Sequence, residues 1–192
     1  KIIEKIVKAS IKIKVPILTF YTFSSENWKR PKKEITFLFK LINYYFNKEI
    51  DNLIKNNIKI NVIGNLRNLP KNVRQTLIDS MKKTQKCNKI LVNLAINYGS
   101  KNEIIEAMRQ IQKKKLPIGI NNLQNNLYTK DTKDPDILIR TGGKKRLSNF
   151  LLWQMAYTEI YFIDKLWPDF KVADYIKIIN SFKKVKRNFG KV

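Results

Sequence analysis

The sequence predicts a single α/β domain with a mostly parallel central sheet covered by helices. Apolar, β-branched runs alternate along the chain with segments whose apolar residues have helical spacing. Such alternation produces parallel strands joined by right-handed helical crossovers. The chain has 192 residues, 43% of them hydrophobic, and no low-complexity linker. One domain therefore accommodates residues 1–192.

The first elements alternate helix and strand. Residues 1–10 (KIIEKIVKAS) form an amphipathic helix, because Lys and Glu interrupt their apolar residues. Residues 15–23 (VPILTFYTF) are apolar, β-branched and aromatic, so they form a buried strand. The polar residues 24–31 form a loop. Residues 35–53 have helical spacing, and the alternating residues 58–64 (IKINVIG) form the next strand.

The middle of the chain continues the alternation. Pro70 opens a helix that runs to about Lys86, since Pro is favoured in the first turn. Residues 89–98 (KILVNLAINY) form a buried strand, and residues 101–114 form a helix with one apolar face. Residues 117–135 are predicted to be mostly loop, with one short helix around Leu123.

The last elements are shorter. Residues 137–140 form a strand that ends in Thr141-Gly142-Gly143. Residues 148–157, rich in Leu, Trp and Met, are predicted to form a helix. Residues 159–163 form a strand, and residues 173–186 form the final helix.

Composition excludes several classes of protein and of site. With six Gly and six Pro the chain is not collagen-like, and its one cysteine, Cys87, cannot pair within the chain. No apolar run approaches the roughly 20 residues of a membrane span. The sequence contains no histidine, so His-based triads and His metal sites are excluded within it.

The net charge of +24 has two interpretations. A large positive field attracts nucleic acid. Only seven of the 39 basic residues are Arg, however, and the lysines are spread along the whole chain. Proteins that read nucleic-acid grooves concentrate Arg and aromatic residues on one element. We therefore expect no nucleic-acid partner, whereas anionic substrates or anionic lipid fit the charge.

Two polar clusters each follow a predicted strand, at residues 24–31 and 140–149. Parallel strands end at one rim of a sheet, so we expect both clusters there. Arg30, Arg140 and Arg146 supply planar donors that match phosphate oxygens, and Gly142 and Gly143 allow backbone N–H groups close approach. This set suits a diphosphate. The alternative is that the arginines are ordinary surface charges.

Two further features have competing interpretations. Ser148 begins the predicted helix 148–157 and either caps it or donates to an anion. Glu159 opens an apolar strand, where it is either a Mg²⁺ ligand or half of a salt bridge. The helix 35–53 has many aromatic residues, which form either a wide core face or the wall of a cavity for a hydrocarbon chain.

Three segments carry a resemblance to a known family. TFSSENWKRP (22–31), IRTGGKKRLSNFLLWQMAYTEIYF (139–162) and LWPDF (166–170) resemble the cis-prenyltransferases, closest to the bacterial undecaprenyl diphosphate synthases. The similarity runs from about residue 1 to 190. It implies an isoprenyl transferase that adds isopentenyl diphosphate units to an allylic diphosphate, usually farnesyl diphosphate, with Mg²⁺. The product is a long cis-polyprenyl diphosphate, a lipid-carrier precursor for cell-wall synthesis.

The resemblance assigns roles to residues. Asn27 matches the asparagine that assists proton removal, and Glu159 matches the metal-linked carboxylate. Part of the hydrophobic tunnel matches the helix 35–53. The positions that match substrate-binding residues are Ser24, Ser25, Glu26, Trp28, Arg30, Arg140, Arg146, Leu147 and Ser148.

The sequence also departs from the family. The family's Asp-Gly-Asn-x-Arg-Trp segment, whose Asp binds Mg²⁺, would precede Lys1, so we expect an N-terminally incomplete copy that is inactive alone. The family's C-terminal Arg-x-Gly, which crosses its dimer, has Asn188 at the arginine position here, with Arg187 beside it. The resemblance implies a homodimer in the cytoplasm and leaves peripheral membrane contact open. The alternative is a non-catalytic subunit of the same fold.

Overall fold

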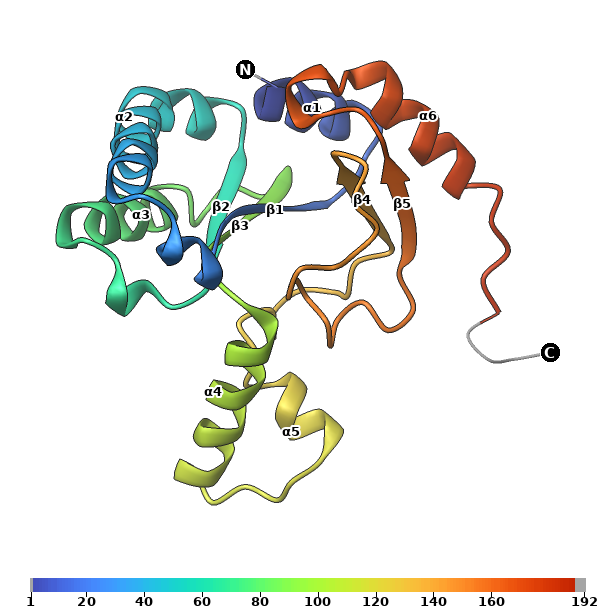
Figure 1. Ribbon diagram of the computed structural model, residues 1–192. Coiled ribbons are helices and arrows are strands. Elements are labelled where there is room, and N and C mark those ends of the chain that lie inside the picture. Colours follow the sequence, from blue (N-terminus) through green and yellow to red (C-terminus); the bar gives the residue numbers. More distant parts are fainter. Residues whose placement is uncertain (1, 189–192) are drawn as a thin grey trace. The chain divides into compact units, whose positions relative to one another are not determined.

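The computed structural model describes residues 2–188, and all of its paired strands run parallel (Figure 1). This confirms the predicted α/β class. The strands form a three-stranded sheet of order β1-β3-β2 and a separate pair, β4-β5, rather than one continuous ladder. The hydrophobic pattern locates strands but does not specify their partners, which long-range packing selects.

The described residues group into two compact units. The three-stranded unit comprises Lys14–Asp131, and the two-stranded unit comprises Lys1–Ile13 with Thr132–Val192. That the whole chain acts as one domain stays a prediction.

The sheet of the three-stranded unit is built around β3 (Ile90–Tyr98), which is buried along almost its whole length. β1 (Ile17–Ser24) and β2 (Ile58–Ile63) flank it. β1 is half-buried except at Phe23 because it is an edge strand. A register shift between Tyr21 and Phe23 marks a bulge just before the loop 24–31.

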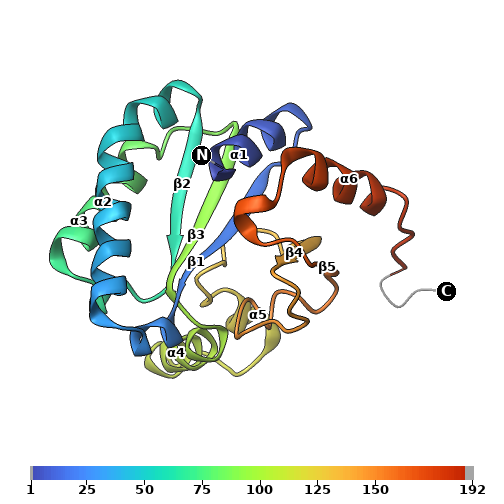
Figure 2. The same cartoon turned by 45° about the horizontal axis from the view of Figure 1, so that its top comes forward.

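Two helices, α2 (Lys32–Lys55) and α3 (Lys71–Lys83), pack against each other and against β2 (Figure 2). α2 buries a stripe of large apolar residues at intervals of three or four: Ile35, Phe39, Ile42, Phe46, Ile50 and Leu53. That spacing is one face of a helix. The aromatic residues of α2 therefore divide: Phe39 and Phe46 are in the core, while Phe37 and Tyr44 face solvent.

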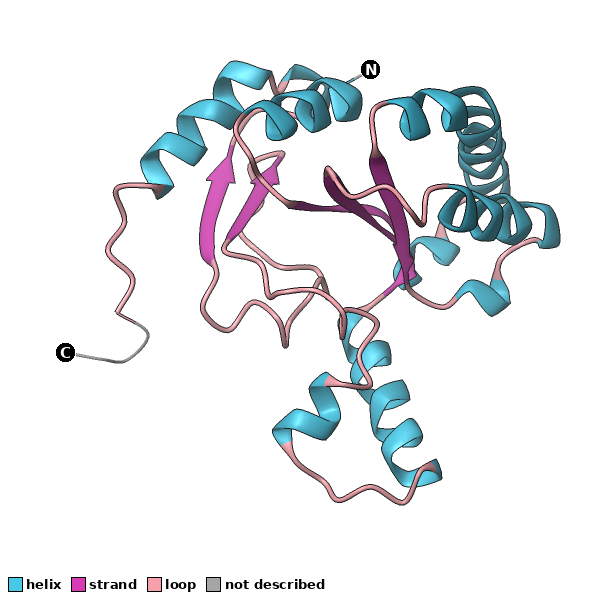
Figure 3. Ribbon diagram, turned by 180° about the vertical axis from the view of Figure 1, so that it is seen from behind, coloured by secondary structure: helices cyan, strands magenta, loops and turns pink. Residues whose placement is uncertain are grey.

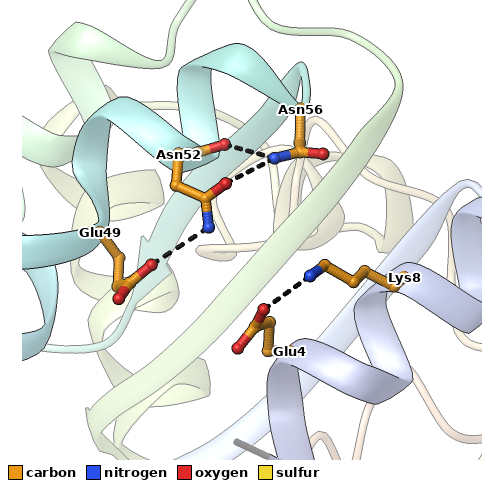
Figure 4. Close-up of polar contacts among 5 residues, drawn as sticks. All are labelled: Glu4, Lys8, Glu49, Asn52 and Asn56. Atoms are coloured by element: carbon orange, nitrogen blue, oxygen red, sulfur yellow. Dashed lines mark hydrogen bonds and ion pairs between the residues drawn. The ribbon is translucent and has the colours of Figure 1, made fainter.

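The C-terminal end of α2 is closed by amide side chains (Figure 4). Asn56 Nδ2 donates to the carbonyl of Asn52 at 2.8 Å and to its Oδ1 at 2.7 Å. Asn52 Nδ2 in turn donates to Glu49 Oε2 at 3.1 Å. The Asn52 carbonyl also accepts the backbone N–H of Asn56 at 3.0 Å, so the amide side chains add further bonds at the helix end. The same figure shows the Lys8–Glu4 ion pair along α1 (Ile2–Lys12), one helical turn apart.

The α4–α5 hairpin, α4 (Ser100–Lys113) and α5 (Ile120–Gln124), follows β3 (Figure 3). It is fixed by Glu103, whose side chain is buried. Tyr98 donates its hydroxyl to Glu103 Oε2, and the backbone N–H of Tyr128 donates to Oε1 at 2.8 Å. A buried carboxylate is tolerated because both oxygens accept hydrogen bonds.

The two-stranded unit contains the pair β4 (Ile137–Thr141) and β5 (Glu159–Ile163). Its helices α1 and α6 (Val172–Phe182) pack together, and the Ser10 and Tyr175 hydroxyls share a buried hydrogen bond of 2.8 Å. Short 3₁₀ turns complete the fold: η1 (Ser25–Lys29), η2 (Leu66–Asn68) and η3 (Trp167–Asp169).

The helix predicted at 148–157 is wrong. The segment is a run of turns in which Ser148, Asn149 and Leu151 have φ of 50°, 61° and 43°. Positive φ is incompatible with a right-handed helix. The apolar spacing of the segment reports burial of Phe150, Leu151 and Met155 rather than a helix.

Among residues 2–188, no helix combines the length and the apolar character needed to cross a membrane.

Candidate active site

The arginine cluster, which we define as Arg140, Arg146 and Ser148, lies in the two-stranded unit. Arg140 is near the C-terminal end of β4. Its Nη1 donates to Ser148 Oγ at 3.0 Å and to the backbone carbonyl of Arg146. The loop after β4 thus folds back onto the strand that precedes it. Three of the predicted substrate-binding residues are brought together by these contacts.

Arg140 carries an unfilled hydrogen-bond donor. Its Nε is buried and has no hydrogen-bond partner within the described part of the chain. Burial lowers the pKa of the guanidinium, and the positive charge of Arg146 adds to that shift. Both causes disfavour two cations at this place. A bound anion would stabilise this arrangement, because it would accept a hydrogen bond from the Arg140 guanidinium and offset the positive charges of Arg140 and Arg146.

The predicted role of the two glycines needs a correction. Gly142 and Gly143 have φ of 89° and 67°, which only glycine adopts easily. Their N–H groups donate to Lys165 O at 2.8 Å and to Ile163 O at 3.0 Å. They turn the chain against the end of β5 and their amides are not available to a phosphate.

The remaining residues of this loop differ in exposure. Leu147 is half-buried, and its carbonyl accepts the N–H of Phe150 at 3.2 Å. Arg146, Lys144 and Lys145 are exposed. The positive charge of the loop is therefore accessible from solvent.

Glu159 lies apart from the arginine cluster. It pairs with Ile137, whereas Arg140 pairs with Phe162. The offset of three residues puts about 10 Å of strand between Glu159 and the position of Arg140, at roughly 3.3 Å per residue, and places the two side chains on opposite faces of the pair. Glu159 is half-buried, and its N–H donates to Asp136 O at 3.0 Å.

The described residues do not by themselves fit a Mg²⁺ site. No three His, Cys, Asp or Glu side chains gather within residues 2–188 in a way that could hold a metal ion. Mg²⁺ also binds through one or two carboxylates and substrate phosphates. The strands do not by themselves bring Glu159 and Arg140 together, because the two residues lie three positions apart along the pair and on opposite faces.

A second group of predicted residues forms η1 in the three-stranded unit, directly after β1. Asn27 closes its first turn, because its Oδ1 accepts the backbone N–H of Ser24 at 2.9 Å. This contact gives Asn27 a structural role that the sequence did not reveal. It also fixes the orientation of the carboxamide that the family resemblance assigns to proton removal.

Trp28 anchors the turn to the core. Its ring lies 5.3 Å from that of Phe23 and 5.6 Å from that of Phe39. Its Nε1 donates to Asn97 Oδ1 at 2.7 Å, and Asn97 Nδ2 donates to Asn65 O at 2.7 Å. Asn97 has a φ of 49°, so it is held in a left-handed conformation at the end of β3. It was not among the predicted site residues, although an Asn that ends a buried strand was a detectable signal.

The polar residues in and beside η1 differ in whether they have hydrogen-bond or ion-pair partners. Arg30 Nη1 makes an ion pair of 2.6 Å with Glu34, and both side chains are exposed. Ser25 Oγ is buried and has no hydrogen-bond partner among the described residues, so it can accept or donate to a ligand.

Tyr21 borders this turn and was also missed by sequence reasoning. Its hydroxyl donates to Tyr98 O at 3.2 Å. Burial raises the pKa of Tyr21 to about 12, and the negative charge of Glu26 contributes, while a hydrogen bond with Ser24 lowers it. The phenol is neutral at physiological pH and serves as a hydrogen-bond donor.

At the C-terminus, Arg187 is engaged within its own chain. It forms an ion pair with Asp136, and its Nη2 donates to Tyr157 O at 2.9 Å. Its guanidinium also lies 5.6 Å from the centroid of the Phe182 ring. Asn188 is the last described residue, and Gly190 of the predicted Arg-x-Gly position lies outside the described residues.

Sequence comparisons identify relatives along the whole chain. A family model described as "Putative undecaprenyl diphosphate synthase" matches residues 1–190. The chain is 45% identical to an isoprenyl transferase of Rickettsia bellii over 190 residues, which cover 98% of this chain and 84% of the relative. It is 41% identical to an isoprenyl transferase of Oceanobacillus iheyensis over 195 residues, covering 98% and 77%.

Solved structures agree. A probable undecaprenyl diphosphate synthase from Campylobacter jejuni superposes with a TM-score of 0.91 at 39% identity, covering 98% of this chain and 90% of that one. Lavandulyl diphosphate synthase from Lavandula x intermedia, in complex with dimethylallyl diphosphate, gives 0.93 at 30% identity, covering 99% and 85%. This chain belongs to the undecaprenyl diphosphate synthase family of cis-prenyltransferases.

Proposed function

We propose that this chain condenses isopentenyl diphosphate units onto an allylic diphosphate, farnesyl diphosphate being the expected starter. The product is a long cis-polyprenyl diphosphate that serves as a lipid-carrier precursor for cell-wall synthesis. Family membership supports prenyl chain elongation. The observation that carries the substrate assignment is the unpartnered, buried Nε of Arg140 beside a second arginine.

The arginine cluster would hold the diphosphate of the isopentenyl unit. Arg140 offers a planar fork of donors, one edge of which is already oriented by Ser148. Binding of its diphosphate positions the isopentenyl alkene for attack on the allylic unit. The bimolecular reaction then becomes effectively unimolecular within the bound complex.

The reaction breaks the C1–O bond of the allylic diphosphate, and the diphosphate leaves with the electron pair. The isopentenyl alkene forms the new bond to C1, and the isopentenyl unit then loses a proton to give the cis double bond. An amide is too weak a base to take that proton alone. We assign the released diphosphate as the proton acceptor, because it is a stronger base than an amide, and Asn27 the role of orienting it, which is compatible with its fixed carboxamide.

Mg²⁺ dependence, homodimer formation and peripheral contact with a membrane are part of the proposal as family expectations. When bound, Mg²⁺ would neutralise charge on the leaving diphosphate. Glu159 is the predicted ligand. Because Glu159 and Arg140 lie apart in one chain, the metal is not assigned to the diphosphate at Arg140.

The test is lipid synthesis from farnesyl diphosphate and labelled isopentenyl diphosphate, with Mg²⁺ or with a chelator. The chain is used together with whatever upstream segment its gene encodes. We expect a ladder of products that ends in one long polyprenyl diphosphate and disappears with the chelator. A folded protein that gives no product would support the alternative, a non-catalytic subunit of the same fold.

A further inference from the structure

The outward side of α2 carries large apolar side chains in water. Phe37, Leu41 and Tyr44 are 62%, 46% and 63% exposed. Their spacing of four and three residues puts them on one face, opposite the buried stripe that contains Phe39 and Phe46. The core of the unit is already filled by that stripe, so the outward residues do not pack within the described chain.

Lysines surround these apolar residues. Lys32, Lys33, Thr36, Phe37 and Lys40 line an open groove of about 330 Å³. One turn further, the ammonium of Lys48 lies 5.5 Å from the centroid of the Tyr44 ring and donates to its hydroxyl at 3.3 Å.

The same stretch is almost free of negative charge. Between residues 32 and 48 the one acidic residue is Glu34, and an ion pair with Arg30 occupies it. The outward side of α2 is therefore both apolar and strongly basic over about four turns, at 3.6 residues per turn.

We propose that the α2 face, defined as Lys33, Phe37, Lys40, Leu41, Tyr44 and Lys48, docks on the surface of a bilayer that contains anionic lipid. Amphipathic helices bind bilayers with aromatic and aliphatic residues at the headgroup boundary and lysines on the lipid phosphates. Aromatic rings favour this boundary because they are amphipathic. The proposal names the surface for the membrane contact suggested above, but it rests on α2 alone and not on the proposed reaction.

A bilayer fits these residues better than nucleic acid does. Nucleic-acid surfaces use Arg and stacked aromatics, whereas the α2 face has no Arg and includes Leu41, which reads no base and binds no phosphate. Its three lysines and three large side chains match the two components of a lipid surface, the charge of the headgroups and the hydrocarbon below them.

The experiment is vesicle flotation without substrate, using phosphatidylcholine vesicles with and without phosphatidylglycerol. We expect binding only when phosphatidylglycerol is present, and weaker binding at high salt. The double variants Lys33→Glu/Lys40→Glu and Phe37→Ser/Tyr44→Ser should each reduce binding about tenfold or more. All four positions are exposed, so the variants should fold, which circular dichroism checks.

Matched controls come from the same unit. Lys82→Glu/Lys83→Glu on α3 makes the same change in net charge, and Ile105→Ser on α4 removes an exposed apolar side chain. Equal loss in these controls would overturn the proposal, because net charge or general hydrophobicity would then explain binding. Binding to vesicles of phosphatidylcholine alone would also overturn the proposal. A third contradicting result would be α2 variants that lose retention on a DNA or RNA column but still bind vesicles.

Prenyl transfer measured in detergent separates the two proposals. Any tunnel wall on α2 would lie on its inward stripe, which contains Phe39 and Phe46, and the substituted side chains lie on the opposite side. Variants of the α2 face should therefore keep that activity while they lose vesicle binding. A protein that binds vesicles through the α2 face but makes no polyprenyl product would contradict the proposed function and leave this inference standing.

Discussion

Arg140 illustrates how a single side chain combines structure and binding. Its Nη1 donates to Ser148 and to the Arg146 carbonyl, and these bonds hold the loop after β4. Its buried Nε has no hydrogen-bond partner among residues 2–188. The residue is thus oriented before any substrate arrives. Preorientation lowers the cost of binding because less side-chain freedom is lost.

Changing Arg140 to Ala should weaken binding of isopentenyl diphosphate by about ten- to a hundredfold, the size expected for a hydrogen bond to a charged group. Binding of the allylic starter should change much less. The measurement is isothermal titration of each diphosphate. Lys144→Ala, an exposed lysine in the same loop, is the control for charge. Equal losses for the two substrates would refute the assignment.

Asn27 has a capping role and a proposed chemical role, and two variants separate them. Asn27→Ala removes the acceptor for the Ser24 N–H and should lower the free energy of unfolding by about 1 kcal/mol as well as the rate. Asn27→Asp keeps an acceptor and should preserve stability while slowing turnover. Thermal unfolding and initial rates measure the two effects. An aspartate variant with full activity would show that Asn27 acts only as a cap.

At the scale of elements, the end of β2 depends on one glycine. Gly64 has a φ of 126°, and a Cβ at this position would lie 2.1 Å from the carbonyl oxygen of Ile96. The clash is with the backbone of the central strand, which cannot move without breaking the sheet.

Gly64→Ala should therefore lower the free energy of unfolding by about 2 kcal/mol or more. Gly119→Ala is the matched control, because no atom lies within 4 Å of a Cβ there and its backbone is extended. Urea unfolding of both variants gives the comparison. Similar stabilities for the two would contradict the close approach seen at Ile96.

The element scale also shows why the helix predicted at 148–157 is absent. Phe150, Leu151 and Met155 are buried, as the apolar pattern required. A run of turns can bury these side chains as well as a helix can. Ser148 has a positive φ in this run, and its hydroxyl accepts a hydrogen bond from Arg140. Sequence periodicity reports which side chains are buried and does not report the backbone path that buries them.

At the scale of the whole molecule, three buried or half-buried tyrosines make the free energy of unfolding depend on pH in the alkaline range. Burial raises the pKa of Tyr21 to about 12 and raises the pKa values of Tyr128 and Tyr175, in both units. An unfolded tyrosine loses its proton near pH 10. Between pH 10 and 12 the folded state therefore binds more protons than the unfolded state, so stability falls as pH rises.

Tyr21→Phe should make this loss of stability shallower, because one of the raised groups no longer titrates. The measurement is the free energy of unfolding from pH 8 to pH 12 for both proteins. Tyr157→Phe, which removes an exposed phenol, is the control for the substitution itself. A slope unaffected by Tyr21→Phe would show that its phenol does not couple folding to protons in this range.

Much of the fold and part of the site could be predicted, for physical reasons that particular residues show. The strand at 159–163 and the helix at 35–53 were predicted because periodicity and length are local properties. Arg140, Arg146 and Ser148 were predicted together because a short loop links them. Asn97 and Tyr21 were missed, since their importance comes from neighbours distant in the sequence.

The sequence alone determined the class of fold, the order of most of its elements and the family, because alternating hydrophobic patterns and long motifs are local properties of the chain. Only the tertiary structure decided how strands pair, that the amides of Gly142 and Gly143 donate to Lys165 and Ile163, and that Glu159 lies away from Arg140. It also decided which side of α2 faces water. These properties depend on register and on contacts between distant segments, which no local pattern encodes.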